Sequence, residues 1–264
     1  MMKTLVWPLT AMLLMTGCIS VDSNDSVTNE LGETVSTETL TLNGLWDGQF
    51  DQDGDLRVLM YQGTVFAIDD SQGYYGSIEL ENSTQIATLS LTAWAISASD
   101  DTAGHYLADG TSLTYDLEGL VYTTSSTDDT LVGDYENDSS AGSFYLTDDG
   151  TWSNNSSTSL VAGEWTAGDY SLYVTSLGSN ASIRAISSAT GGCTFDGYLT
   201  PTDSDYNLYT VLITERKNCT DYNAVNVAGY ATITTDGELE FFIHDTGLIY
   251  YMIFTAATSD TTTE

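Results

Sequence analysis

The sequence predicts an all-β protein, and three observations carry this prediction. Apolar and polar residues alternate with a period of two over most of the chain after residue 40, as in strands with one buried face. Turn-forming residues close each run, and the whole chain contains two prolines. No stretch of ten or more residues in this region has a helical period. We therefore expect antiparallel sheet throughout the body of the chain.

The alternating segments mark the expected strands. They are Leu56–Tyr61, Thr64–Ile68, Tyr75–Leu80, Ile86–Ala95, Ser112–Thr123, Ser143–Thr147, Ser171–Leu177, Ser182–Ile186, Thr194–Leu199, Tyr206–Thr214, Val225–Thr234, Glu238–His244 and Leu248–Thr255. Gly and Asp readily adopt positive φ, so hairpin turns are expected at the Asp-Gly pairs. These pairs are Asp53-Gly54, Asp109-Gly110, Asp149-Gly150 and Asp236-Gly237.

A faint internal repeat predicts two lobes. Leu42-Asn43-Gly44-Leu45-Trp46 aligns with Val161-Ala162-Gly163-Glu164-Trp165, and Tyr75-Gly76-Ser77-Ile78 aligns with Asp196-Gly197-Tyr198-Leu199. We expect tandem lobes over residues 41–152 and 159–256, each an antiparallel β-barrel or β-sandwich of about eight strands. Chance matching of short motifs in a Gly-rich sequence is the alternative explanation.

Residues 1–17 have the composition of a secretion signal. One positive charge, Lys3, precedes an uncharged run from Thr4 to Thr16, and Pro8 interrupts the apolar part of this run. The apolar stretch is too short to span roughly 30 Å of hydrocarbon at 1.5 Å per residue, so a permanent transmembrane helix is not expected.

The junction Met15-Thr16-Gly17-Cys18 resembles the lipobox of bacterial lipoproteins, with Met at the first position where Leu is usual. The resemblance implies a signal peptide cleaved before Cys18 and fatty acyl chains, such as palmitate, on that cysteine. Ile19 in place of Asp implies sorting to the outer membrane of a Gram-negative bacterium, on either face. Cleavage without lipidation is the alternative. Residues 18–40 are expected to form a flexible lipidated tether, and residues 257–264 a disordered tail.

The remaining cysteines are expected to form a disulfide. With Cys18 used by the lipid, Cys193 and Cys219 are an even pair in an oxidising compartment. Closing a loop of about 25 residues is worth roughly 3 kcal/mol in the loop-entropy account. Two free thiols are the alternative.

Charge excludes several classes of partner. The chain has 38 acidic and five basic residues, and loss of residues 1–17 leaves a net charge of −34. Such a surface repels nucleic acid and anionic lipid headgroups. Self-repulsion also destabilises the compact state unless cations screen it, so we expect a salty habitat, bound divalent cations, or both.

Few residue patterns indicate chemistry. The cluster Asp51-x-Asp53-Gly54-Asp55 is a candidate calcium loop, because alternate carboxylates can converge on one ion, but its Gly stands fourth instead of sixth and Gln62 stands at position twelve. A simple hairpin is the favoured interpretation. With two histidines, His105 and His244, both expected at the surface, and no Gly-x-Ser-x-Gly, no zinc or catalytic site is expected.

The Gly-x-Trp motifs, Gly44–Trp46 and Gly163–Trp165, resemble the lipocalin signature, in which Trp closes one end of the barrel. The basic residue and the flanking helix of that pattern are missing from this sequence. A pair of lipid-anchored barrels is also similar in architecture to surface lipoproteins of Gram-negative bacteria, although none of their specific motifs is present. The likeness therefore implies an architecture and no function.

The favoured function is that of a lipid-anchored envelope or cell-surface protein with a non-catalytic binding or interaction role. Its partners would be the membrane, through the lipid, and a protein, glycan or small ligand. Two alternatives remain, a carbohydrate-active hydrolase that uses Asp or Glu and a calcium-dependent adhesive module. Apart from that possible Ca²⁺, no cofactor is expected.

Overall fold

The computed structural model describes residues 26–28, 34–36, 42–51, 53–100, 105–122, 129–189 and 192–257. Over these residues the chain is all-β except for one short helix, α1 (Thr158–Val161), so the prediction of an all-β antiparallel fold is confirmed. Within this part, no helix is long and apolar enough to cross a membrane. Cys18 and most of the predicted tether lie outside the described residues, although β1 (Ser26–Thr28) and β2 (Thr34–Ser36) pair antiparallel.

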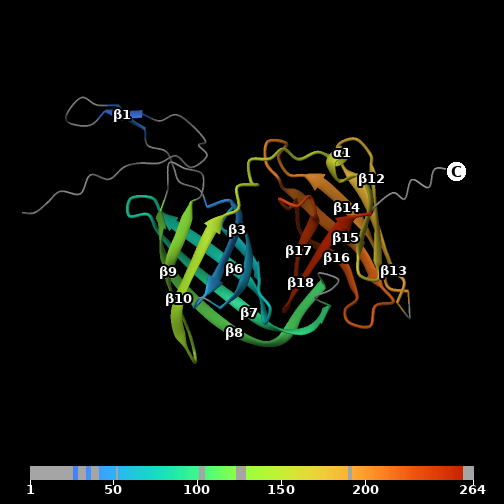
Figure 1. Ribbon diagram of the computed structural model, residues 1–264, viewed down its shortest axis with the longest axis horizontal. Helices are drawn as coiled ribbons and strands as arrows, with labels where there is room; N and C mark the ends of the chain where they lie inside the picture. Colours follow the sequence, from blue (N-terminus) through green and yellow to red (C-terminus); the bar gives the residue numbers. More distant parts are fainter. Residues whose placement is uncertain are drawn as a thin grey trace, which may run out of the picture.

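The second half of the chain forms a closed antiparallel barrel of eight strands, the second ring (Figure 1). Each strand pairs with its neighbour in sequence, and β11 also pairs with β18 to close the circuit. The strands are β11 (Gly163–Ala167), β12 (Tyr170–Ser176), β13 (Ala181–Ser187), β14 (Thr194–Pro201), β15 (Tyr209–Lys217), β16 (Ala224–Ile233), β17 (Leu239–Asp245) and β18 (Leu248–Ala256).

The strands of the first half, here called the first ring, pair in the same sequential manner. Their hydrogen bonds also run in a circuit, because β10 pairs with both β9 and β3, and β8 pairs with β9. The strands are β3 (Gly44–Phe50), β4 (Asp53–Tyr61), β5 (Thr64–Ile68), β6 (Gln72–Glu81), β7 (Ile86–Asp100), β8 (His105–Tyr122), β9 (Thr130–Asn137) and β10 (Ala141–Asp148).

The start of β8 also forms part of the second ring. In Figure 1 the green ribbon of β8 extends from one ring to the other, and residues His105–Ala108 pair with residues 249–252 of β18. On the same side of β18, β11 bonds to Thr255 and Ala256. Leu107 is 2% exposed within the core of the second ring. The first half of the chain therefore supplies a section of wall to the second ring.

Three apolar clusters stabilise this arrangement. One fills each ring, and the third lies between the rings, where outward-facing side chains such as Phe66, Phe242 and Ile249 meet. A buried ion pair crosses the same interface, since Arg57 Nη2 lies 2.5 Å from Glu240 Oε1 and Arg57 Nη1 lies 2.7 Å from Asp149 Oδ2. Because Glu240 also accepts hydrogen bonds from Thr232 and Tyr251, its buried charge is fully compensated.

The Asp-Gly prediction of hairpin turns is right at one position and wrong at three. Gly237, with φ of 78°, lies in the hairpin between β16 and β17, whereas Gly150, with φ of 74°, follows β10 where the chain continues to α1. Asp109-Gly110 instead lies inside β8, because the β7–β8 hairpin continues to the second ring; a Cβ on Gly110 would lie 2.9 Å from the carbonyl oxygen of Ala95 beside a register shift. Asp53-Gly54 starts β4, and the positive φ belongs to Asp51.

The residues of the internal repeat occupy equivalent strands. Trp46 lies on β3 and Trp165 on β11, while Gly76 lies on β6 and Gly197 on β14, so both pairs are eight strands apart. A Cβ on Gly76 would lie 2.0 Å from the carbonyl oxygen of Ser90, and a Cβ on Gly197 would lie 2.1 Å from that of Leu212. Both glycines therefore permit the same close approach of neighbouring strands.

Candidate functional site on the outer face of β7 to β10

The outer face of β7 to β10, on the side of the first ring, presents one continuous apolar row. The antiparallel register sets Ile86, Leu120, Val132 and Tyr145 beside one another on four neighbouring strands. Leu120, Val132 and Tyr145 are 42%, 37% and 42% exposed. At about 4.8 Å between strands, the row is roughly 15 Å long. It is the apolar part of the candidate site.

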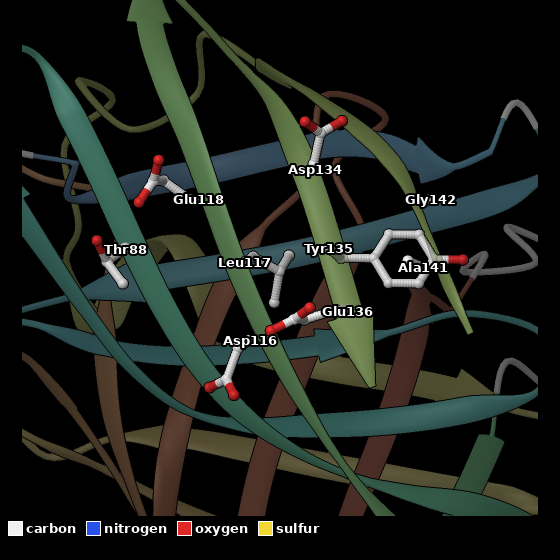
Figure 2. A pocket seen from close by; sticks show the side chains of 9 residues that line it. All are labelled: Thr88, Asp116, Leu117, Glu118, Asp134, Tyr135, Glu136, Ala141 and Gly142. Atoms are coloured by element: carbon white, nitrogen blue, oxygen red, sulfur yellow. The ribbon is translucent and has the colours of Figure 1, made fainter. Parts of the chain in front are cut away.

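Two acidic rows run beside the apolar row. They lie two and four residues from it along the strands, which is about 7 Å and 14 Å. In the first of these rows Glu118 lies opposite Asp134, and in the second Asp116 lies opposite Glu136. Figure 2 shows these four carboxylates, here called the acidic block, around a hollow of about 630 Å³. A second hollow of about 330 Å³ adjoins Val132 and Tyr145. The face is thus recessed, apolar along one line and acidic along the next.

Nothing in the described fold neutralises the acidic block with a cation. Like charges directly opposite one another on paired strands cost about 0.2–1 kcal/mol per pair. Arg57 and Arg216 are engaged in the interior, and the two exposed cations, Arg184 and Lys217, lie on β13 and β15 beside Asp196 and Glu215. Ser90 Oγ donates a 3.2 Å hydrogen bond to Asp116, and this donor carries no charge. The chain therefore tolerates an unfavourable arrangement of charge on this face.

The side chains behind the face are firmly held. Tyr135 donates a 2.6 Å hydrogen bond to Asp51, and the backbone N–H of Ser143 donates a 2.8 Å bond to the same carboxylate. The Tyr135 bond, and then the Ser143 bond, lower the pKa of Asp51, and the bond to Asp51 together with burial raises the pKa of Tyr135 to about 12. Phe50 packs edge-on against Tyr135. This network ties β9 and β10 to the turn after β3.

The residues of the candidate calcium loop lie in different surroundings. Asp51 is engaged by Tyr135 and Ser143, Asp55 is exposed on β4, and the side chain of Asp53 lies outside the described residues. Among the residues that are described, no group of three His, Cys, Asp or Glu side chains is placed to hold a metal ion. A calcium site over Asp51, Asp53 and Asp55 stays a prediction.

The second ring contains a different polar cluster. Arg216, whose side chain is fully buried, donates to Asp221 at 2.9 Å and to the Tyr250 hydroxyl at 3.0 Å. Burial raises the pKa of Asp221, but the hydrogen bond and charge of Arg216, together with backbone hydrogen bonds, lower it, so the net shift is downward. The predicted disulfide between Cys193 and Cys219 is present beside this cluster, with a Cα–Cα distance of 4.4 Å. The cluster closes one end of the ring, and its charges compensate each other.

Both histidines were expected at the surface, and that expectation is wrong. His244 stacks on Tyr75 of the first ring with ring centroids 3.6 Å apart, and His105 lies 4.9 Å from the Tyr250 ring. Both are partly buried, because the β7–β8 hairpin and the interface between the rings cover them. Within the described part of the chain, neither belongs to a group of three side chains that could hold a metal ion.

Sequence reasoning missed the apolar row and the acidic block. Alternation places Leu120 and Tyr145 at outward positions of two expected strands. Val132 lies on β9, which is not among the expected strands, and the alignment of the three residues depends on pairing register. The sequence signal that could have revealed the row is a single apolar residue among polar ones on the solvent face of each of three successive strands. No protein-family model, curated protein or solved structure matches the chain.

Proposed function

We propose that this chain is a non-catalytic binding protein that holds a macromolecular partner on the outer face of β7 to β10. The observation that carries the proposal is the row Ile86, Leu120, Val132 and Tyr145, of which the last three are exposed on an acidic surface with two hollows. Contiguous exposed apolar side chains rimmed by polar residues are typical of interaction sites. The buried polar clusters, in contrast, are engaged in internal ion pairs and hydrogen bonds.

The proposal includes the setting of this face. We propose that residues 41–152 and 159–256 form two barrels in tandem, that Cys18 carries a lipid, and that the body is thereby held at the outer membrane of a Gram-negative bacterium. The lipobox-like Met15–Cys18, the repeat and the two circuits of strand pairing support this arrangement. A binding protein in this position needs no catalytic group, only a rigid exposed surface.

The binding role can be tested with variants of the face. The bait is the full chain with Cys18→Ser, so that lipid does not itself retain membrane proteins. In the face variant, Leu120, Val132 and Tyr145 are changed to Thr, which keeps strand propensity while removing apolar area. We expect capture of envelope proteins by the unaltered face and its loss in the face variant, measured by quantitative mass spectrometry.

A matched control is available on the second ring. Tyr173, Tyr198 and Leu212 are 43%, 42% and 37% exposed, so Thr substitutions there remove similar exposed area. This control should capture the same proteins as the parent chain. Equal capture by all three baits would contradict the proposed site.

The anchor is tested separately. Cys18→Ser should yield a chain that leaves the membrane fraction and lacks the mass of acyl chains. Unchanged mass and unchanged membrane association would contradict lipidation.

A further inference from the structure

We infer that the β7–β10 face binds a cationic amphipathic helix of another protein, with the apolar side of the helix on the apolar row and its Lys or Arg residues over the acidic block. This inference rests on the proposed binding function and names the chemistry of the partner. Its basis is the parallel course of an apolar row and two carboxylate rows on one sheet face, with one hollow beside the carboxylates and a second beside Val132 and Tyr145.

The dimensions of the face match one side of a helix. The apolar row crosses four strands and is roughly 15 Å long, the length of about ten helical residues. Apolar residues three and four apart on a helix lie about 5–6 Å apart, close to the 4.8 Å spacing of the strands. The carboxylate rows lie about 7 Å and 14 Å to one side, within reach of Lys or Arg side chains that flank the apolar stripe.

Charge decides which partner fits. Asp116, Glu118, Asp134 and Glu136 oppose each other in like-charged pairs, and cationic side chains would relieve that repulsion. An anionic lipid surface would instead be repelled. The face is thus complementary to a positively charged apolar surface, and a helix with one basic side provides it in a single element.

The chain cannot supply this partner from its own sequence. Its five basic residues are Lys3, Arg57, Arg184, Arg216 and Lys217, and the two that are adjacent include the fully buried Arg216. Residues 19–40 contain acidic residues and no basic ones, so this segment is repelled from the acidic block. A second copy brings a net charge of −33. The occupant therefore belongs to a different, basic protein.

A synthetic peptide provides the test. The probe is a helical Leu/Lys peptide of about 18 residues with Leu along one side, long enough to cover the face. Two control peptides have the same composition in scrambled order, or Glu in place of Lys. Binding to the full chain with Cys18→Ser is measured by fluorescence anisotropy at low and high salt, with chelator present.

Two charge variants separate this face from the general acidity of the protein. In the first, Asp116→Asn, Glu118→Gln, Asp134→Asn and Glu136→Gln neutralise the acidic block. In the second, Glu164→Gln, Asp169→Asn, Asp205→Asn and Asp236→Asn remove four exposed charges from loops and a strand of the second ring. Both variants carry the same net charge, so a difference between them reports the position of the charges.

The block variant should bind the amphipathic peptide about tenfold more weakly and with a smaller dependence on salt, while the matched variant stays within about twofold of the parent. Equal weakening in both variants, equal binding of the scrambled peptide, or no binding at all would overturn the inference. Calcium that binds through the same four carboxylates while the peptide does not would overturn it as well. If the peptide fails but Thr substitutions in the apolar row still abolish capture from envelope extract, the proposed binding function stands without this partner.

Discussion

The two rings carry equivalent tryptophans in different environments. Trp165 donates its indole N–H to the carbonyl of Val161 at 2.8 Å, because α1 places that carbonyl at the end of the second ring. Trp46, its counterpart, is 3% exposed, and its Nε1 has no hydrogen-bond partner among the described residues. The repeat thus preserves the apolar role of each tryptophan and the fold around it, while the polar closure of the ring end differs.

The opposite ends of the rings differ as well. In the first ring, tyrosine hydroxyls donate to carboxylates, as Tyr74 does to Asp69 and Tyr135 to Asp51. In the second ring, a buried cation, Arg216, sits among Tyr250, Asp221 and the nearby disulfide. A hydroxyl–carboxylate pair leaves the net negative charge in place, whereas Arg216 cancels that of Asp221. We therefore expect the second ring to depend more strongly on single polar side chains.

The largest expected effect concerns this buried cation. Arg216→Leu would leave Asp221 and the Tyr250 hydroxyl without their partner, at a cost of about 3 kcal/mol in the free energy of unfolding. Urea unfolding followed by tyrosine and tryptophan fluorescence measures the loss. Adding Asp221→Leu should recover part of it, because the uncompensated charge is then removed. A single variant as stable as the parent would contradict the structural role of Arg216.

Removal of the disulfide should cost somewhat less. The Cys193→Ala, Cys219→Ala double variant frees a loop with a sequence separation of 26 and should lose roughly 3 kcal/mol or less in the free energy of unfolding. Denaturant unfolding of the parent with and without reductant provides the comparison. The reductant should leave the double variant unchanged; a further loss would show that another thiol contributes.

Exchange of the two tryptophans for Phe sharpens the comparison of the ring ends. Both substitutions lose similar apolar area, but Trp165→Phe also leaves the Val161 carbonyl without its donor. We expect Trp165→Phe to be about 1 kcal/mol more destabilising than Trp46→Phe. Equal losses in chemical denaturation would mean that the Val161 hydrogen bond contributes nothing net.

The smallest effect is a dependence on pH at the interface between the rings. Burial lowers the pKa of His244, and the neighbouring Asp245 offsets only part of this shift. The unfolded chain, with a His pKa of about 6.5, binds the proton more readily. The contribution of neutral His244 to the free energy of unfolding is therefore fully present above about pH 6.5. It is lost as the pH falls from about 6.5 through the lower pKa that His244 has in the folded protein.

His244→Gln should flatten the decline in the free energy of unfolding between about pH 7 and pH 5. Urea titrations at several pH values measure that slope in the parent and the variant. An unchanged slope would assign the pH dependence to other groups.

Much of the fold follows from local sequence. Period-two alternation predicts most of the strands but not β9, and the aligned Gly44–Trp46 and Gly163–Trp165 fall on β3 and β11, eight strands apart. Cysteine counting predicts the Cys193–Cys219 bond. These features depend on side-chain periodicity and residue identity, which are visible in short segments.

The candidate site could not be predicted in the same way. The apolar row exists because the pairing register of β8 to β10 aligns Leu120, Val132 and Tyr145, and register is a property of paired strands. The extension of β7 and β8 was also missed, because Asp109-Gly110 reads as a turn in isolation. Contacts between distant strands determine both features.

The shared use of β8 limits how the two halves can be separated. Residues His105–Ala108 satisfy backbone groups of β18 that β11 does not reach, and Leu107 fills part of the neighbouring core. If the chain arose by duplication, its present halves are no longer interchangeable copies, since the later half has come to rely on a hairpin encoded in the earlier one. Dividing the chain between its two halves would therefore separate β18 from the segment of β8 that pairs with it.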